Sequence, residues 1–600
     1  MLSIIKEEWK NIIESELKIK AGSTEIESLV IGTPPKQEMG DIAFPMFTYS
    51  KLLRLSPAQI ANDIKTSLEQ RSDLPKGSLL TAGPYLNVKL DTASLVNDLI
   101  KEVANDDYGK NEINKGKKVM IEFSCPNTNK PLHLGHMRND SLGMAVAELL
   151  KYSSAEVKKV NLINNRGVHI CKSMCAYQMF SNGETPESCG EKGDHFVGRY
   201  YVKYAQWEKE FVKNALEAAG EVSSEEAEEI KKNAEVEANR LPQEMLVKWE
   251  NGDEEVIALW NKMNNWTLDG LAESYTNMNI NFDKYYYESN TYKLGKSEVL
   301  KGVEKNVYFK AEDGSIQIDL EPIGLDKKIL LRKDGTSIYM TQDLGTAVNR
   351  HEDYPFDSMI YVVASEQQYH FKVLFYALKQ LGYKWAEELH HLSYGMVNLP
   401  SGRMKSREGT VVDADDLLEN LTSLAKNEII SKERESVLDD VDEVSRKIAL
   451  AALNYYLLQV TPSKDMIFNP DESIAFSGNT GPYLQYMGAR ISSMLSKYTA
   501  KEGIEFDGSL LVVEDEKLLI KLIASFPDVV VKAVKNYDPS EICTFLYDLS
   551  KTFSHYYHDN QILKAETDEL ILARVELSKM VLKVLQSAFK IVQIPFLNAM

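Results

Sequence analysis

The sequence predicts an α/β protein with a parallel-sheet core and a helical insertion, a small α+β domain before the core and an all-α bundle after it. Strand, loop, helix and strand follow one another between residues 118 and 163, an order that implies a parallel β-α-β unit. Short apolar strands at 328–332 and 358–364 are expected to extend the sheet, and only helical patterns remain after residue 417. At 600 residues the chain is also too long for one hydrophobic core.

Residues 1–112 mix helical and strand-like patterns. Apolar residues have helical spacing between 56 and 68, and residues 85–90 alternate as in a half-buried strand. A polar stretch with two glycines, 105–118, predicts a linker. We therefore expect a separate α+β domain at 1–112.

The parallel-sheet domain is predicted at 113–416, with a mainly helical insertion at about 176–285. Strand patterns at 118–124 and 157–163 enclose a helical pattern. The insertion is acidic, since residues 207–255 hold 15 acidic and 6 basic side chains, a net charge of −9. Such a charged stretch is typical of a long solvated helical hairpin.

The remaining residues are predicted to be helical, with a connecting segment at 417–469 and a terminal domain at 470–600. Apolar residues recur there at three- and four-residue spacing, which is typical of amphipathic helices in a bundle. The clearest stretches are 448–456, 484–495, 518–531 and 570–592.

The composition excludes several classes of protein. With 44% hydrophobic and 26% charged residues, the chain is neither disordered nor fibrous. No apolar run approaches the roughly 20 residues that span a bilayer, and the chain starts with an acidic amphipathic pattern instead of a secretory signal. Five irregularly spaced cysteines are typical of reduced thiols. We expect a cytoplasmic monomer that does not contact membranes.

The net charge of −20 argues at first against a nucleic-acid partner. However, 207–255 contributes −9 and 433–443 contributes −5, so the other residues carry only −6. Phosphate binding depends on where charges lie and not on their sum. If the partner is a polyanion, we expect both acidic runs to face away from it.

The strongest chemical signal is the run Pro126-Asn-Thr-Asn-Lys-Pro-Leu-His-Leu-Gly-His136, where the first strand gives way to its helix. Ligands bind at this edge of a parallel sheet, and free amides at a helix start favour phosphate. Gly135 lets a flat ring approach the backbone, and His133 and His136 share one helix face. Two histidines also suit a metal site or mere packing, but the neighbouring lysine and asparagine favour a nucleotide.

A second signal is the basic loop Gly402-Arg-Met-Lys-Ser-Arg-Glu-Gly409, after an apolar strand at 392–399 and before a helix near Asp415. Three cationic side chains between glycines suit the anionic end of a nucleotide and can stabilise a leaving pyrophosphate. Taken alone, the loop could equally be a basic surface loop without a function.

Together, the two motifs resemble the signature pair of class I aminoacyl-tRNA synthetases. The finer pattern resembles arginyl-tRNA synthetases over nearly the whole chain, and it implies a Rossmann-like catalytic domain, an additional N-terminal tRNA-binding domain and a C-terminal anticodon-binding bundle. The matching stretches are 122–138, 332–343, 361–370, 478–490, Gly40-Asp41 and Ala82-Gly-Pro84.

The resemblance implies an arginine–tRNA ligase. Such an enzyme activates L-arginine with ATP to arginyl-adenylate, releases pyrophosphate and transfers arginine to the 3′ end of tRNA(Arg). Mg²⁺ would be shared with the ATP phosphates, and no structural metal is expected.

The resemblance also assigns arginine-binding residues. Asn127, His136 and Gln367 would hold the amino and carboxylate ends, and Glu288, Tyr339 and Asp343 the guanidinium. A planar cation with five donors requires such carboxylate and phenolic oxygens. Tyr339 and Asp343 share one face if their segment is helical, although Asp343 would also suit a helix N-terminus. The complete implied set is Glu122, Cys125, Pro126, Asn127, His136, Glu288, Tyr339, Asp343 and Gln367.

Catalysis in this family relies on positioning and charge neutralisation, because the arginine carboxylate is already a nucleophile. His370 is a further candidate contact for ATP, and a helix cap is its alternative. The implied catalytic residues are Lys130, His133, His136, Arg403, Lys405, Ser406 and Arg407. The implied ATP-binding residues are His133, Gly135, His136, His370, Met404 and Lys405.

Tyr483, Tyr486 and Arg490 are the candidate tRNA contacts in the terminal domain, with Tyr556 and Tyr557 as further tyrosines. Single-stranded bases are read by stacking on such side chains and by hydrogen bonds. Each tyrosine could instead be half-buried in a helical core.

Four positions depart from the family pattern. The basic loop lacks lysine at its fourth place, for which Lys130 is thought to compensate, and Cys125 replaces serine. The run Asn164-Asn-Arg-Gly-Val-His169 replaces Asn-Asp-Trp-Gly, and the end 596–600 lacks the usual arginine.

Cys171 and Cys175 next to His169 invite comparison with a zinc site. The usual second cysteine pair is absent from the sequence, so we expect no metal there.

Two alternatives remain open. One is a class I synthetase for another amino acid, such as lysine or cysteine, against which the pair Tyr339 and Asp343 argues. The other is a catalytically idle tRNA-binding or regulatory relative, against which the intact Lys130, His133, His136 and Asp343 argue.

Overall fold

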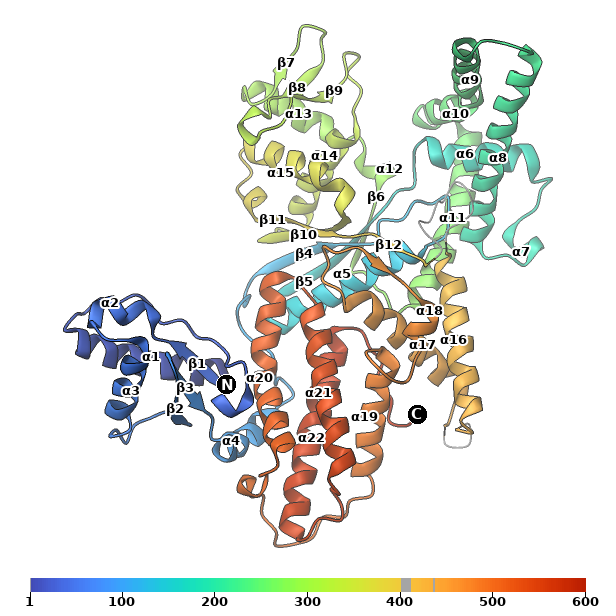
Figure 1. The fold of residues 1–600 in the computed structure, drawn as a ribbon. Helices are drawn as coiled ribbons and strands as arrows, with labels where there is room; N and C mark the ends of the chain where they lie inside the picture. The colour runs from blue at the N-terminus through green and yellow to red at the C-terminus, as the bar shows by residue number, and fades with distance from the viewer. Residues whose placement is uncertain (1, 401–411, 435–437) are drawn as a thin grey trace.

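A five-stranded parallel sheet forms the centre of the computed structural model, which describes residues 2–400, 412–434 and 438–600 (Figure 1). The strand order is β11-β10-β4-β5-β6, and each neighbouring pair is parallel. The order reverses beside β4, which is where open parallel sheets bind ligands. The strands are β4 Lys118–Glu122, β5 Glu156–Ile163, β6 Lys284–Tyr287, β10 Ser358–Ala364 and β11 Leu389–Tyr394. The predicted α/β class is confirmed.

Helix α5 (Leu134–Tyr152) crosses from β4 to β5 and packs between the sheet and the terminal helices. It is buried almost all round, as expected for a helix covered on both sides. The opposite face of the sheet is covered by α14 (Tyr339–Asp353) and α15 (Gln368–Gln380), whose apolar side chains share a core with Met120 and Met359.

A small lobe lies between β6 and α14 (Figure 1). We expected the strand at 328–332 to extend the parallel sheet, and this prediction is wrong. It pairs antiparallel with β8 in a separate three-stranded sheet of order β7-β8-β9. The elements of the lobe are α12 Glu288–Thr291, α13 Gly295–Glu304, β7 Phe309–Lys310, β8 Ile316–Ile318 and β9 Lys328–Leu331.

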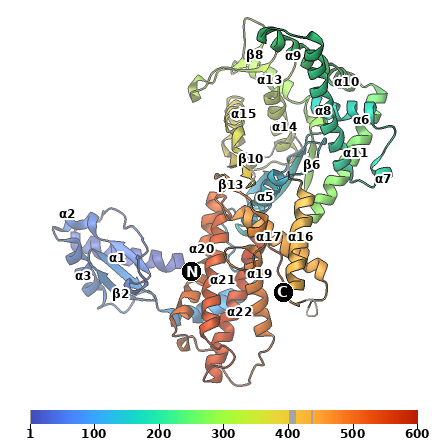
Figure 2. The same ribbon diagram turned by 45° about the vertical axis from the view of Figure 1, so that its right-hand side comes forward.

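The insertion is helical, as predicted, but it is more than a hairpin. Helix α8 packs against α6, α9 and α11 around a core of its own (Figure 2). A capping box of Ser223 and Glu226 starts α9, most of whose acidic side chains are exposed. The helices are α6 Val168–Phe180, α7 Pro186–Cys189, α8 Gly193–Ala219, α9 Ser224–Ala238, α10 Arg240–Glu250 and α11 Glu254–Asn277.

The N-terminal region folds as an α+β unit beside the terminal helices (Figures 1 and 2). Its antiparallel sheet has the order β1-β3-β2. Asp41 joins it to the bundle, because its carboxylate pairs with Lys521 at 2.5 Å and accepts a hydrogen bond from the Leu90 amide at 2.8 Å. The elements are α1 Leu2–Ala21, β1 Ile42–Pro45, α2 Ser50–Leu53, α3 Pro57–Leu68, β2 Ser78–Ala82, β3 Tyr85–Lys89 and α4 Thr92–Ala104.

The C-terminal part is a helical bundle, with one departure from the prediction of helix alone. Two residues, β13 (Met466–Ile467), pair in parallel with β12 (Val397–Asn398). Among the described helices, none is long and apolar enough to cross a bilayer. The helices are α16 Ala414–Ser431, α17 Val441–Leu458, α18 Pro470–Ser473, α19 Gly481–Leu495, α20 Glu514–Asn536, α21 Ser540–Asp559 and α22 Asp568–Ile591.

Arg138, in the second turn of α5, ties the sheet domain to the connecting segment. Its guanidinium is buried and donates hydrogen bonds to four backbone carbonyls. Two belong to Gly395 and Met396, at 2.6 and 3.1 Å, and two to Pro462 and Lys464, at 3.3 and 2.8 Å. A forked donor with five N–H groups suits this task, which lysine cannot perform.

The segment after residue 411 is attached to the same helix start. Leu134 donates its amide to the Val412 carbonyl, and Ala414 donates to the Leu132 carbonyl, both at 3.1 Å. His133 and Asp413 form the β-bridge between them. The residues that follow position 411 are therefore fixed next to the histidine pair.

We expect Arg138→Leu to loosen the segments at 395–398 and 462–467 without unfolding the N-terminal sheet. Losing several hydrogen bonds from a charged donor costs about 3 kcal/mol, or roughly 100-fold in local opening. Hydrogen exchange measured by mass spectrometry would show this acceleration. Arg446→Leu is the matched control, since Arg446 donates to the exposed end of α11. Unchanged exchange in both segments would contradict the anchoring role.

Candidate active site

Many of the predicted site residues lie where strands of the parallel sheet end, whereas Tyr339 and Asp343 lie on α14. The histidine run follows β4, the run 164–169 follows β5, and Glu288 is the first residue after β6. Gln367 and His370 follow β10 in the same way. Because the carboxyl ends of parallel strands meet at one edge, residues far apart in sequence converge there.

The turn after β4 is held in an unusual backbone conformation. Ser124 and Cys125 have φ values of 76° and 50°, in the left-handed region that side chains other than glycine rarely adopt. Side-chain oxygens of Asn139 and Asn161 accept hydrogen bonds from their two amides, at 2.6 and 3.1 Å. Burial raises the pKa of the Cys125 thiol. Cys125 and the buried Pro126 therefore shape the turn.

His133 and His136 are set as neutral donors by the backbone. The Gly135 amide donates to Nδ1 of His133, and the His133 amide donates to Nδ1 of His136, both at 3.1 Å. Each Nδ1 is thus an acceptor, so the proton of each neutral ring is on Nε2. Burial, aided by nearby positive charge, lowers the pKa of His133 to about 3 and that of His136 well below its usual value. The ring centroids are 3.9 Å apart.

Gly135 is required by this pair as well as by a ligand. A Cβ at residue 135 would lie 2.9 Å from Cε1 and 3.0 Å from Nδ1 of His133. Any side chain would therefore push the ring away from the amide that orients it. Lys130 lies beside the pair, and its burial lowers its pKa.

A cleft of about 1410 Å³ opens at the carboxyl ends of β5 and β6, between the insertion and the small lobe. It brings together four predicted arginine-binding residues: Asn127, Glu288, Tyr339 and Asp343. Tyr339 and Asp343 are one turn apart on α14, so the predicted helix is confirmed. Tyr339 is 76% exposed toward this space.

Two acids give the cleft its chemical character. The pKa of Glu288 is raised to about 7, because burial and the nearby Asp343 raise it more than Arg166 lowers it. Asp343 is not in the first turn of α14, which argues against the helix-start alternative, and it is bonded to His370 Nε2 at 2.5 Å. Closely spaced acids in a half-buried cleft favour a cationic ligand.

Several predicted residues do not reach the cleft. Glu122 is buried and ion-paired with Arg350, so the structure does not support its place in the arginine set. Gln367 is exposed, and neither Gln367 nor His370 lines the cleft; Nε2 of His370 is bonded to Asp343. Arg403, Met404, Lys405, Ser406 and Arg407 lie outside the described residues.

Other residues of the cleft were not predicted. Arg166, Lys293, Lys296 and Arg332 also line it, from the turn after β5, the lobe and the loop after β9. In the sequence, Arg166 stood out only because it departs from the family pattern. The lysines lie in a polar stretch without any motif, so nothing in the sequence distinguished them.

One group of described residues has the spacing of a metal site, namely Asp194, His195 and Asp415. The ammonium of Lys192 already lies among them, 2.6 Å from Asp415 and 3.2 Å from Asp194. Ion pairing with these carboxylates raises the pKa of His195 to about 9. The group is thus an ion-pair network that attaches the insertion to the start of α16.

Cys171 and Cys175 lie in the core of the insertion. Burial raises the pKa of both thiols to about 12, which disfavours the thiolate that zinc requires.

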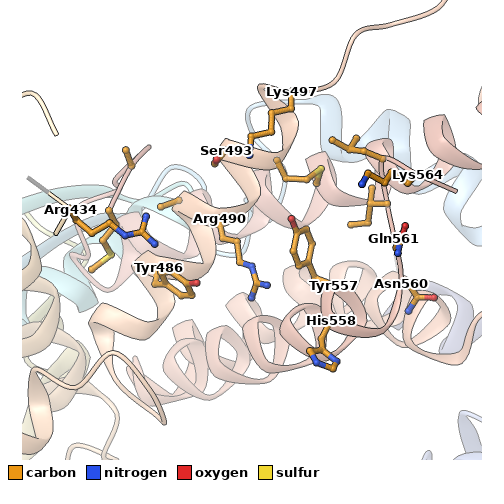
Figure 3. Close-up of a pocket in the computed structure, with 16 residues that line it drawn as sticks. Arg434, Tyr486, Arg490, Ser493, Lys497, Tyr557, His558, Asn560, Gln561 and Lys564 are labelled. Carbon is orange, nitrogen blue, oxygen red and sulfur yellow. The ribbon is translucent and has the colours of Figure 1, made fainter. Parts of the chain in front are cut away.

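A second cavity, of about 640 Å³, lies in the terminal bundle between α19, the end of α21 and the chain end (Figure 3). Arg490 and Tyr486 line it, and the Arg490 guanidinium lies 4.3 Å from the centre of the Tyr557 ring. Tyr556 is buried in the core and bonded to Glu516, so its candidacy is wrong, and Tyr483 does not line the cavity.

Comparisons with known proteins match the whole chain. A family model described as tRNA synthetases class I (R), catalytic domain, matches residues 98–470. The DALR anticodon binding domain matches 484–600, and the arginyl tRNA synthetase N terminal domain matches 7–90.

Similar proteins carry the same names. An arginine–tRNA ligase of Treponema denticola is 50% identical over 610 residues, covering 99% of this chain and 100% of the relative. One of Bacteroides thetaiotaomicron is 45% identical and covers 95% of both chains. The structure of Thermus thermophilus arginyl-tRNA synthetase superposes with a TM-score of 0.77 at 25% identity, covering 99% of this chain and 100% of that one. The chain therefore belongs to the arginyl-tRNA synthetase family.

Proposed function

We propose that the cleft at the carboxyl ends of β5 and β6 binds L-arginine and that the α5 turn binds ATP. As a member of its family, the chain is an ATP-dependent ligase of arginine and tRNA. The observation that carries the assignment of the cleft is the pair of acids, Glu288 and Asp343, beside the exposed phenol of Tyr339. These are the acceptors that a guanidinium requires.

In the first step, a carboxylate oxygen of arginine attacks the α-phosphorus of ATP, and the bond to the pyrophosphate oxygen breaks. The products are arginyl-adenylate and pyrophosphate, and no base is needed. The two Nε2–H groups of His133 and His136 suit the donation of hydrogen bonds to phosphate oxygens, and Lys130 adds positive charge. In the second step, the terminal ribose hydroxyl of tRNA attacks the acyl carbon and AMP leaves.

We assign Arg403, Lys405, Ser406 and Arg407 to the departing pyrophosphate, with Met404 beside the nucleotide. Support comes from the flanks of this segment, since Val412 and Asp413 pair with the backbone around His133. Mg²⁺ would bind with ATP, held mainly by its phosphate oxygens.

The cavity between α19 and α21 is our candidate site for an anticodon base. Arg490 stacked on Tyr557 gives a flat cationic platform, and Arg434, Lys497 and Lys564 add positive charge around it (Figure 3). Stacking on such a platform binds single-stranded bases, and the cations serve the phosphates. Tyr486 lines the same cavity, whereas Tyr483 is left without an assigned role.

We further propose a cytoplasmic monomer. All five cysteines are free thiols, which suits a reducing compartment. The cleft and the cavity are each built from one chain.

The two alternatives make different demands on the cleft. A synthetase for lysine or cysteine does not need two acids and a phenol arranged for a forked donor. An idle relative does not need two histidines whose protons are both directed away from the backbone. Arginine–tRNA ligases at 45–50% identity argue against both alternatives.

We expect Asp343→Asn to lower kcat/KM for arginine by about 100-fold, the effect of losing roughly 2–3 kcal/mol of charge-assisted hydrogen bonding. Charging of tRNA(Arg) with arginine, lysine and cysteine would be measured for the unchanged protein and for Asp343→Asn. Glu352→Gln, on an exposed face of the same helix, is the control. Charging with lysine above arginine would overturn the assigned substrate, and failure to charge any amino acid would favour the idle relative.

Gly135→Ala should lower kcat by about 10- to 100-fold, because the new methyl group displaces the His133 ring that donates to phosphate. KM for arginine should change little. Pyrophosphate exchange with tRNA present measures the first step alone. Gly32→Ala, where a Cβ meets only ordinary contacts, should be neutral. Full activity of Gly135→Ala would remove the histidine pair from the mechanism.

Arg490→Leu should weaken tRNA binding by roughly 10- to 100-fold, the usual effect of losing one base stack. KM for ATP and for arginine should stay the same, since the cavity is separate from the cleft. Lys551→Leu removes a comparable cation beside Tyr547, outside the cavity, and should have no effect. Equal tRNA affinity in the two variants would exclude the cavity as a base-binding site.

A further inference from the structure

The cleft that we assign to the substrate arginine contains a guanidinium of the protein itself, that of Arg166. It lies in the turn between β5 and α6, and its side chain is only 8% exposed. One nitrogen, Nη2, is bonded to Glu250, the last residue of α10 in the insertion. The other, Nη1, lies 3.9 Å from a carboxylate oxygen of Glu288. The Arg166 side chain thus connects Glu250 of the insertion to Glu288, the acid that we assign to substrate binding.

Aromatic rings hold this guanidinium in place. Its central carbon lies 4.0 Å from the centre of the Tyr292 ring and 5.6 Å from that of Trp249. Its Nε is buried and has no hydrogen-bond partner among the described residues. Because arginine stays protonated in proteins, the positive charge remains beside Glu288 at every working pH.

The preceding residue, Asn165, also connects the insertion to helix α12. Asn165 accepts a hydrogen bond from Trp260 of the insertion at 2.6 Å through its carbonyl. Its side chain exchanges two hydrogen bonds of 3.0 Å with Ser289, which follows Glu288 in α12. The run 164–167 therefore transmits the position of the insertion to the helix that carries Glu288.

We propose that Arg166 is a positioning residue that keeps Glu288 charged and oriented for the substrate guanidinium, and that it links this state to helix α10 of the insertion. The inference rests on the proposed arginine-binding role of Glu288. Arg166 takes the place of a tryptophan in the commoner family pattern, so the device would belong to chains with arginine at this position.

The other charges near Glu288 do not replace Arg166. Asp343 of α14 raises the pKa of Glu288 and so disfavours its charged form. Lys284 of β6 is paired with Asp353 of α14, at the other end of these elements.

Further basic groups belong to the elements around this acid. Arg350 of α14 is paired with Glu122 in the core. Lys293, Lys296, Arg332 and His169 line the same cleft, and Arg166 is the group whose ion pair with Glu288 carries the argument. Asp334 and Glu250 are the remaining acids of the cleft wall.

The sign of the pH effect follows from this arrangement. Without Arg166, burial and Asp343 act unopposed, so the pKa of Glu288 rises above its value of about 7. The acid is then mostly protonated at neutral pH and accepts a guanidinium poorly. Raising the pH restores the charge, so the defect should shrink as the pH increases.

The test is the KM for arginine in tRNA charging at pH 6.5, 7.5 and 8.5. At pH 6.5, the KM of Arg166→Gln should be roughly ten times the KM of the unchanged protein. This ratio should fall below about threefold at pH 8.5, because each pKa unit is a factor of ten. The kcat at saturating arginine should change by less than about threefold, since a positioning residue acts here on binding. Arg199→Gln removes an arginine stacked on Phe196 and Tyr200 away from the cleft, and should leave KM unchanged.

Three further variants separate the possible failures. Arg166→Lys retains the positive charge that attracts Glu288 and should keep a KM within about threefold of the unchanged protein at each pH. If it matched Arg166→Gln, the charge would not be the cause and the proposal would be wrong. Should Arg166→Gln fail to fold, Glu250→Gln still tests the link, because it releases Arg166 at a more exposed position and should raise KM by about two- to fivefold. An unchanged KM in that variant would overturn the link to the insertion.

Glu288→Gln distinguishes this inference from the proposed function. If it leaves KM for arginine unchanged, the assignment of Glu288 to the substrate fails. If it raises KM while the defect of Arg166→Gln is absent or independent of pH, the assignment of Glu288 stands and the role of Arg166 is refuted.

Discussion

The buried guanidinium of Arg138 is the interaction on which the geometry around α5 depends. It joins the start of α5 to the segment before residue 401 and to the connecting segment at 462–464 through four carbonyls. Val412 and Asp413 pair with the backbone around His133. One helix start thus holds both the histidine pair and segments on either side of residues 401–411. Its own turn uses backbone amides to orient two imidazoles, so the donors are set before a ligand arrives.

The charges around each site differ from the net charge of the protein. The total of −20 hides a bundle cavity surrounded by Arg434, Arg490, Lys497 and Lys564. The cleft has both signs of charge, with Glu288 and Asp343 beside the phenol of Tyr339 and with Arg166, Lys293, Lys296 and Arg332 elsewhere on its lining. If the cleft binds arginine as proposed, another amino acid would lose the charge-assisted bonds to these acids, which discriminates strongly without an editing step. In the proposed site, the same two carboxylates would serve both substrate binding and specificity.

Periodicity and motif spacing predicted much of this structure. The β-α-β unit, the helical bundle, the helix carrying Tyr339 and Asp343 and the histidine turn all depend on local sequence, and they are confirmed. Pairing between distant strands was harder, since β9 has an apolar pattern like that of β10 but joins an antiparallel sheet. Glu122 matched the family motif, yet only the fold shows that Arg350 takes its carboxylate. Arg166 matched no motif at all, because its role arises from Glu250 and Glu288, 84 and 122 residues further along.

The central claim is that the α5 turn presents two neutral imidazoles whose Nε2–H groups are directed toward the nucleotide. The most direct measurement is ¹⁵N NMR of the protein labelled at histidine, with His133→Gln and His136→Gln variants used to assign the signals. The account predicts that at pH 7 both rings are neutral, with the proton on Nε2, and stay so down to about pH 5. Imidazolium signals for either ring at pH 7, or a proton on Nδ1, would contradict it.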